Sequence, residues 1–300
     1  MKMKKGNSKL YDIFIYLFMI YILIVTLYPF LNVVAISFNE SADTVKGTLF
    51  VIPRKFTLQN YVTIFSSANN NLLHAFFISV ARTVIGTVSG IMASCMLAYT
   101  LSRQDYVFRK PIAIIFVITM YVSGGMIPAY MLIRNLGLLG SFWVYVIPGL
   151  ISVFNVIVIR SFMEGLPISL QESARIDGAN DLVIFYKIVM PLCLPVIATI
   201  SLFIAVGQWN SWFDTYLYAG GNASLSTLQF ELMKILDNTN AASGQSASMR
   251  DPNGRAITNM VSPISIRMAV TIVATVPILL VYPFVQKYFV TGLTLGAVKS

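Results

Sequence analysis

Six long apolar segments set the strongest constraint on how this chain can fold. A bilayer core of roughly 30 Å requires about 20 mostly apolar residues from each helix that crosses it. Segments of this kind cover residues 11–38, 72–101, 112–133, 142–159, 192–217 and 263–289. Hydrophobic residues make up 57% of the 300 residues and charged residues only 11%, too few polar side chains to cover a water-soluble globule. We therefore predict an all-α polytopic membrane protein with six transmembrane helices in a single domain, 1–300.

The basic residues predict the orientation of the chain in the bilayer. If the N-terminus is inside, Lys and Arg are denser in the segments that face the cytoplasm, as the positive-inside rule requires. Both termini are then cytoplasmic. The net charge of +9 follows from this topology, so a nucleic-acid partner is not needed to explain it. The first apolar segment is too long for a cleavable signal, and we expect it to be retained.

A polar segment, 165–190, lies between the fourth and fifth apolar segments. Ser169 and Glu172 have the spacing of a capping box, which predicts a helix that begins there. Gly178 readily adopts the left-handed conformation that ends a helix, so we expect the helix to stop at this residue. Asn180 or Asp181 can cap a second helix. The segment is therefore expected to form a helix, a sharp turn and a second helix on the cytoplasmic side.

The second helix is predicted to carry Leu182, Phe185 and Ile188 on one side. Together with Ala174 and Ala179, these residues would offer a small apolar surface rimmed by charge. Such a surface suits docking to another protein. The alternative is an amphipathic connector that lies on the lipid surface.

The same segment resembles the E-A-A-x-x-D-G-A loop of ABC importer permeases. The matching positions are Glu172, Ala174, Asp177, Gly178, Ala179, Phe185, Ile188, Pro191 and Pro195, and only Ser173 departs, replacing Ala. The six-segment layout and the ending 292–297 resemble the smaller, MalG-like permease of carbohydrate importers. SGGMIPAYMLIRNLGLLGSFWVYVIPG (123–149) and QWNSWFD (208–214) are similar to the branch associated with complex oligosaccharides.

This resemblance implies a type I ABC importer permease fold and a mechanism of coupling. The cytoplasmic loop would dock on an ATPase, which binds ATP and Mg²⁺, so no cofactor is expected on this chain. The implied partners are a second homologous permease, two ATPase subunits, an extracellular solute-binding protein and the lipid bilayer of the bacterial plasma membrane. The residues expected to couple to the ATPase are Glu172, Ser173, Ala174, Asp177, Gly178, Ala179 and Phe185.

No catalytic machinery is expected on the chain itself. It contains no G-x-x-x-x-G-K-[ST] sequence to cradle a nucleotide phosphate. His74 is its one histidine, which rules out a multi-histidine metal site. An ion-coupled secondary transporter of a polar solute is the alternative, although the acidic residues fall in loops or at segment edges. A membrane scaffold would explain the topology but not the cytoplasmic loop.

Substrate contacts are predicted near the outer end of the fifth apolar segment and at a break in the third. Sugars present apolar C–H faces and hydroxyl groups, which suit aromatic and amide side chains. The candidates are Trp209, Asn210, Trp212, Tyr216 and Tyr121. Trp and Tyr also form anchoring belts at membrane interfaces, so the sequence leaves both roles open. The run YVSGGMIPAY (121–130) predicts an interrupted helix.

Three further features concern packing and the long outer loops. Gly86, Gly90, Ser94 and Ala98 recur every four residues and predict close approach of another helix. Arg82 lies within the same span, and functional and structural roles stay equally open for it. Cys95 and Cys193 are predicted as buried core residues. The outer loop 214–262 is rich in Ser, Asn and Gly, a composition that favours turns and solvated chain.

Overall fold

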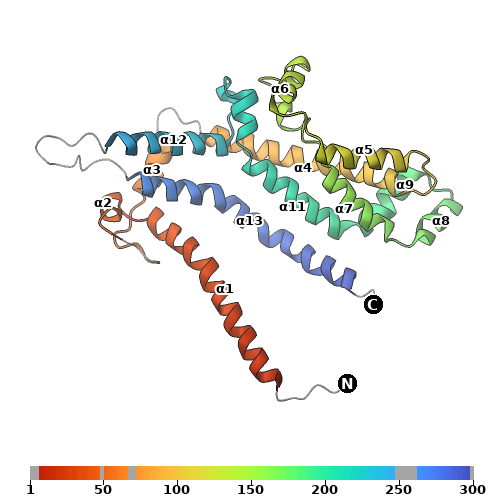
Figure 1. Cartoon of the computed structure of the whole chain (residues 1–300), viewed down its shortest axis with the longest axis horizontal. Coiled ribbons are helices and arrows are strands. Elements are labelled where there is room, and N and C mark those ends of the chain that lie inside the picture. The colour runs from red at the N-terminus through yellow and green to blue at the C-terminus, as the bar shows by residue number, and fades with distance from the viewer. Residues whose placement is uncertain (1–6, 48–50, 67–71, 247–261, 298–300) are drawn as a thin grey trace, which may run out of the picture. The chain divides into compact units, whose positions relative to one another are not determined.

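The fold is almost entirely helical. A computed structural model describes residues 7–47, 51–66, 72–246 and 262–297, and in these ranges the only β pairing is an isolated bridge between Asn39 and Phe56 (Figure 1). The chain divides into two compact units. One comprises 1–70 and 232–276, and the other comprises 71–231 and 277–300.

The first unit contains a long apolar helix followed by a small polar element. Its N-terminal helices are α1 (Asn7–Ser37), α2 (Ser41–Thr44) and α3 (Gln59–Ser66). Asn60 on α3 is buried and donates to the carbonyl oxygens of Ser37 and Asn39 at 2.8 and 2.9 Å. Asn39 in turn donates to Asp43, and this bond together with the nearby Arg54 lowers the pKa of the Asp43 carboxyl. The segment after α1 is therefore folded back on the helix end.

The core of the second unit is built from three helices. These are α4 (Leu72–Ser102), α7 (Val153–Glu164) and α11 (Leu194–Asn210), which lie side by side (Figure 1). The predicted stripe of small residues on α4 is buried as expected. A Cβ atom added at Gly90 would lie 3.5 Å from Ile204 on α11. Cys95 and Cys193 are both free and buried in this core, which confirms their prediction.

Three of the predicted spans are continuous helices. They are Tyr11–Ser37 within α1, Leu72–Ser102, and Pro263–Pro283 within α13 (Pro263–Ala297). Three further helix pairs satisfy the same criteria of length and hydropathy but are bent at a break. The described residues therefore provide three spans, or up to six if each bent pair crosses the membrane once.

The predicted span 112–133 is not one continuous helix, and the predicted interruption at YVSGGMIPAY is confirmed. Helix α5 (Arg109–Tyr121) and helix α6 (Met126–Asn135) meet at an angle of 119°. Gly125 between them has φ +85°, a conformation that glycine adopts without steric penalty. The apolar composition continues through the break, so hydropathy alone did not detect the change in direction.

The predicted spans 142–159 and 192–217 are likewise not continuous helices. The former contains a 3₁₀ turn, η1 (Phe142–Tyr145), then irregular chain through Pro148 and Gly149, and then the first part of α7. The latter contains α11, a break at Ser211, and the π-helical turn η3 (Thr215–Ala219). Both breaks place backbone without regular helical bonding inside apolar sequence.

The prediction that 214–262 is mainly solvated chain is also corrected. After the short turn η4 (Ala223–Leu225), helix α12 runs from Leu228 to Ser246. Thr215 and Thr227 share a hydrogen bond of 2.9 Å, and both side chains are buried. Apolar residues at the start of α12, such as Leu228 and Phe230, are buried and stabilise the helix despite the polar composition that follows. The rest of this loop, 247–261, lies outside the described residues.

Candidate functional site

The segment 165–190, which the sequence predicts to be cytoplasmic and which we call the cytoplasmic loop, folds as a helix, a turn and a second helix. Helix α8 (Ile168–Ile176) is followed by its C-cap, Asp177, and then by Gly178 at φ +81°. The Gly178 N–H donates to the Arg175 carbonyl at 3.0 Å and the Ala179 N–H to the Ala174 carbonyl at 2.9 Å. These two bonds form a Schellman motif, which satisfies carbonyls at the helix end. The predicted stop at Gly178 is confirmed.

The predicted capping box is wrong. Helix α8 begins one residue before Ser169, its N-cap is Pro167, and no side chain caps it. Proline has no side-chain acceptor, and the Leu170 N–H bonds instead to the Pro167 main-chain carbonyl at 3.3 Å. Ser169 and Glu172 are consequently exposed on the helix itself.

The second helix is capped by Asn180, whose side-chain oxygen accepts from the Val183 N–H at 2.9 Å. It runs as α9 (Asp181–Ile184), a π-helical turn η2 (Phe185–Val189) and α10 (Met190–Leu192), and it meets α11 at a bend of 82°. The predicted face is corrected, because Leu182 is 62% exposed. The buried side chains are Ile184, Phe185 and Val189, so of the predicted face Phe185 is buried and Ile188 is half-buried.

The structure divides the predicted coupling residues into two groups. Glu172, Ser173, Asp177 and Gly178 are exposed around the end of α8. Ala174 and Ala179 are half-buried against the core of the second unit, and Phe185 is 2% exposed within it. The exposed group can contact another protein. The second group anchors the loop to its own chain.

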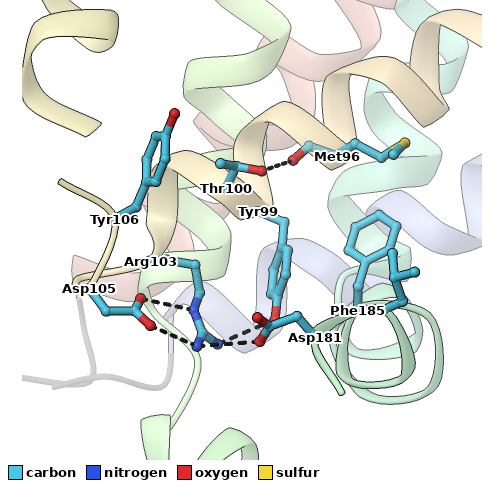
Figure 2. Close-up of a pocket in the computed structure, with 9 residues that line it drawn as sticks. Met96, Tyr99, Thr100, Arg103, Asp105, Tyr106, Asp181 and Phe185 are labelled. Carbon is cyan, nitrogen blue, oxygen red and sulfur yellow. Dashed lines mark hydrogen bonds and ion pairs between the residues drawn. The ribbon is translucent and has the colours of Figure 1, made fainter. Parts of the chain in front are cut away.

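The anchor is formed by an aromatic contact and a network of charged side chains at the end of α4 (Figure 2). The rings of Tyr99 and Phe185 have centroids 5.3 Å apart. Arg103 donates to Gln171 on α8 at 2.7 Å and lies 3.5 Å from the Asp181 carboxylate on α9. It also pairs with Asp105 at 3.3 Å. One guanidinium therefore joins the end of α4 to both helices of the cytoplasmic loop.

A second arginine closes the network. Arg175 on α8 lies 3.3 Å from Asp105 and 3.2 Å from Asp181, so each aspartate pairs with both arginines. A hollow of about 350 Å³ beside these charges is lined in part by Tyr99, Asp105 and Leu182. Side-chain exposures of 60% for Asp105 and 64% for Asp181 place the carboxylates in contact with solvent.

None of these residues was predicted to take part in such a network. Arg103 and Asp105 follow the second apolar segment, whereas Gln171, Arg175 and Asp181 lie about 70 positions later. Arg103 and Asp105 lie beside an apolar segment and the other three lie within the polar segment 165–190, as is common for polar residues of a membrane protein. Contacts between residues so far apart in sequence leave no local pattern.

The predicted substrate residues are not all brought together. Trp212 and Tyr216 lie in an exposed aromatic group after α11, with ring centroids 6.4 Å apart. Asn210 is exposed beside them and accepts from Gln229 at 3.4 Å. Trp209 is 7% exposed and packs edge-on against Phe76. Tyr121 is 85% exposed at the end of α5, next to the break.

Comparison with known sequences shows what kind of protein carries this loop. The family described as "Binding-protein-dependent transport system inner membrane component" matches residues 86–294, more than half of the chain and all of the cytoplasmic loop. The chain belongs to this family. The permease is accordingly a multi-pass membrane subunit of an ABC importer and not an enzyme. Dependence on a binding protein and coupling to an ATPase follow from the family, and the ion-coupled alternative is set aside.

Individual relatives resemble the permease over nearly its whole length. The polygalacturonan/rhamnogalacturonan transport system permease protein YtcP of Bacillus subtilis (strain 168) is 41% identical over 98% of this chain and 100% of its own. Protein LplC of the same organism is 37% identical over 92% of this chain and 90% of its own. A crystal structure of a bacterial ABC transporter involved in the import of the acidic polysaccharide alginate contains a chain that is 27% identical. It matches with a TM-score of 0.81, covering 96% of this chain and 100% of that chain.

Proposed function

We propose that this permease forms half of the translocation pathway of an oligosaccharide importer. It would pair with a second, homologous permease, two cytoplasmic ATPase subunits and an extracellular solute-binding protein, with both of its own termini in the cytoplasm. The full-length identity of 41% to YtcP carries this proposal. Permeases named for arabinooligosaccharide and galactooligosaccharide transport, 26% and 23% identical, also support a sugar substrate.

Oligosaccharides that contain uronic acids are the first substrates to test. The name of YtcP refers to polygalacturonan and rhamnogalacturonan, and the similar solved structure concerns alginate. All three polymers are acidic. Comparing the transport of trigalacturonate with that of neutral arabino- and galacto-oligosaccharides distinguishes acidic from neutral substrates.

The proposed coupling mechanism uses the two groups of loop residues differently. The exposed residues Glu172, Ser173, Asp177 and Gly178 would enter the ATPase surface. Phe185 and Arg103 would then carry the displacement of the loop to the end of α4, because they hold the loop against that helix. ATP and Mg²⁺ would bind on the ATPase, and the movement of the ATPase would displace the cytoplasmic loop and, through it, α4.

Substitution of Gly178 tests the coupling role. A side chain at φ +81° strains the turn by about 1–2 kcal/mol, and an arginine there would also obstruct the exposed docking surface. We expect Gly178→Arg to insert in the membrane and assemble with the second permease. We expect it to abolish both sugar transport and the stimulation of ATP hydrolysis by the loaded binding protein.

Gly137 provides a matched control. It lies beyond α6 at φ +68°, and like Gly178 it has open space where a Cβ atom would lie. Gly137→Arg imposes the same kind of backbone strain away from the cytoplasmic loop, and it should keep most of the transport activity. Full transport by Gly178→Arg, or equal loss in both variants, would contradict the coupling assignment.

A further inference from the structure

A buried arginine lies within α4, on its third turn. Arg82 is 2% exposed within an apolar span of 31 residues. An ionised side chain at such a depth is strongly unfavourable unless a counter-charge and hydrogen bonds compensate it. Asp214 supplies the counter-charge, with Arg82 Nη1 donating to its Oδ1 at 3.1 Å. The Tyr145 ring lies 4.4 Å from the guanidinium carbon and covers one face of it.

The other bonds of Arg82 go to the break that ends α11. Arg82 donates to the Gln208 side-chain oxygen at 3.0 and 3.1 Å and to the Ser211 main-chain carbonyl at 3.3 Å. A carbonyl at a helix end lacks its helical partner, and inside a membrane it must find another. Asp214 continues the support, since its Oδ1 accepts from the Thr215 N–H at 2.9 Å at the start of η3. Arg82 and Asp214 therefore stabilise a broken conformation of the chain.

The break presents three aromatic rings to the surface of the second unit. Trp212, Phe213 and Tyr216 are 36%, 46% and 60% exposed, although Asp214 between them turns inward to Arg82. Their ring centroids are separated by 5.7 to 6.4 Å. We call these three residues the aromatic shelf.

The surroundings of the shelf favour a polar ligand over lipid. Asn210 lies beside it with an exposed amide, bonded to that of Gln229, and such groups are unfavourable against hydrocarbon chains. An interface belt of Trp and Tyr requires no broken backbone held by an ion pair. Broken helices at membrane depth occur where the chain is covered by protein or lines a water-filled path.

We propose that the aromatic shelf binds a sugar ring of the transported oligosaccharide and that Arg82 and Asp214 are the positioning residues that hold it. The rings would stack on the apolar C–H face of the sugar, and Asn210 and Gln229 would bond its hydroxyl groups. This inference rests on the proposed function as an oligosaccharide permease.

Cysteine protection tests the shelf directly. The permease would be assembled with its second permease, ATPase and binding protein in proteoliposomes, and Tyr216→Cys would be labelled with a membrane-impermeant maleimide. The native cysteines are buried and should not react. During turnover with trigalacturonate, or with whichever test sugar the wild type transports, labelling should slow at least about threefold. Trp143→Cys is the control, because Trp143 is 53% exposed on η1 and lies outside the shelf.

The outcomes separate this inference from the proposed function. If the wild type transports none of the sugars, both fail. If it transports one and that sugar protects neither cysteine, or protects both equally, the shelf is refuted and the proposed function stands. Selective protection of Tyr216→Cys supports the shelf.

The positioning role requires a second readout. Asp214→Asn should raise the half-saturating sugar concentration about tenfold, as expected from the loss of about 1.4 kcal/mol of stacking, with less change in the maximal rate. Arg82→Lys keeps the charge and should recover part of the affinity relative to Arg82→Gln. A purely structural role would lower the amount of assembled complex and the maximal rate at unchanged half-saturation, and that result would overturn the assignment.

Discussion

The second unit contains two groups of paired arginines and aspartates in opposite environments. At the cytoplasmic loop, Asp105 and Asp181 are 60% and 64% exposed, and Arg175 is 44% exposed. Within α4, Arg82 is 2% exposed and its partner Asp214 is 23% exposed. Exposed pairs contribute little stability and are screened by salt, whereas a buried charge that loses its partner is strongly destabilising. We therefore expect the arginine–aspartate pairs at the cytoplasmic loop to break and re-form easily, and the pair of Arg82 with Asp214 to stay formed.

The number of partners reinforces this difference. Asp105 and Asp181 each pair with two arginines, so the network can lose one contact and keep its connection to α4. Arg82 instead concentrates its bonds on one short segment, 208–214. Shared ion pairs suit a segment that moves against an ATPase. The concentrated bonds of Arg82 suit a segment that must keep one conformation.

The largest effect is expected from removing the counter-charge of the buried Arg82. Asp214→Ala leaves Arg82 ionised in an apolar span, which should reduce the free energy of unfolding by about 3–5 kcal/mol. The apparent Tm of the purified permease in detergent should fall by roughly 10 °C. The double variant Arg82→Met with Asp214→Ala removes both charges and should recover part of the loss. An unchanged Tm in Asp214→Ala would show that the pair contributes no net stability.

Arg103→Ala should have an intermediate effect on stability and a large one on coupling. Its bonds to Gln171 and Asp181 join the two loop helices to α4, and their loss should destabilise the loop by about 1–3 kcal/mol. We expect the assembled importer to hydrolyse ATP with about tenfold less stimulation by the loaded binding protein. Arg103→Lys, which keeps the charge, is the matched control. Normal stimulation in Arg103→Ala would exclude this side chain from the coupling route.

A smaller effect is expected at the second arginine of the network. Arg175→Ala removes pairs that Arg103 also makes, so the loss should be about 0–1 kcal/mol, as for other exposed ion pairs. Transport should stay within about twofold of the wild type. If Arg175→Ala were as defective as Arg103→Ala, the two arginines would not share their aspartates in the working importer.

The smallest expected effect is a difference between the two regions in how salt changes the Tm of their variants. Raising the ionic strength from about 0.1 M to about 1 M shortens the Debye length from about 10 Å to about 3 Å. The small Tm difference between Arg175→Ala and the wild type should then disappear. The deficit of Asp214→Ala should persist, because a buried pair is screened much less. Equal salt sensitivity of both variants would mean that solvent reaches Arg82.

The sequence predicted those features that have a local cause. Gly178 and Asn180 act within one helical turn of their own positions, and the structure confirms both. Apolar segments were recognised correctly, but hydropathy measures composition and does not follow the direction of the chain. Breaks at Gly125 and at 146–152 therefore divided predicted spans. The break at YVSGGMIPAY was predicted because its two glycines and proline are themselves local signals.

Long-range partners could not be predicted in this way. Arg82 and Asp214 are separated by 132 positions, and the role of Arg82 stayed open until the structure placed them together. The predicted capping box failed because the helix begins at Ile168, one residue early, and the predicted face of the second helix failed at Leu182, which is exposed. In each case a neighbour in space or a small change of register outweighed a sequence pattern.

Gly86 connects the close packing of α4 to the charge that α4 carries. A methyl group at this position would lie 2.8 Å from the Gln208 amide nitrogen, and the same amide group bonds Arg82 through its oxygen. A larger residue at position 86 would displace the Gln208 side chain, which accepts hydrogen bonds from Arg82 one helical turn before Gly86. Glycine at position 86 therefore leaves the space that Gln208 needs to hydrogen-bond the charged guanidinium inside the protein.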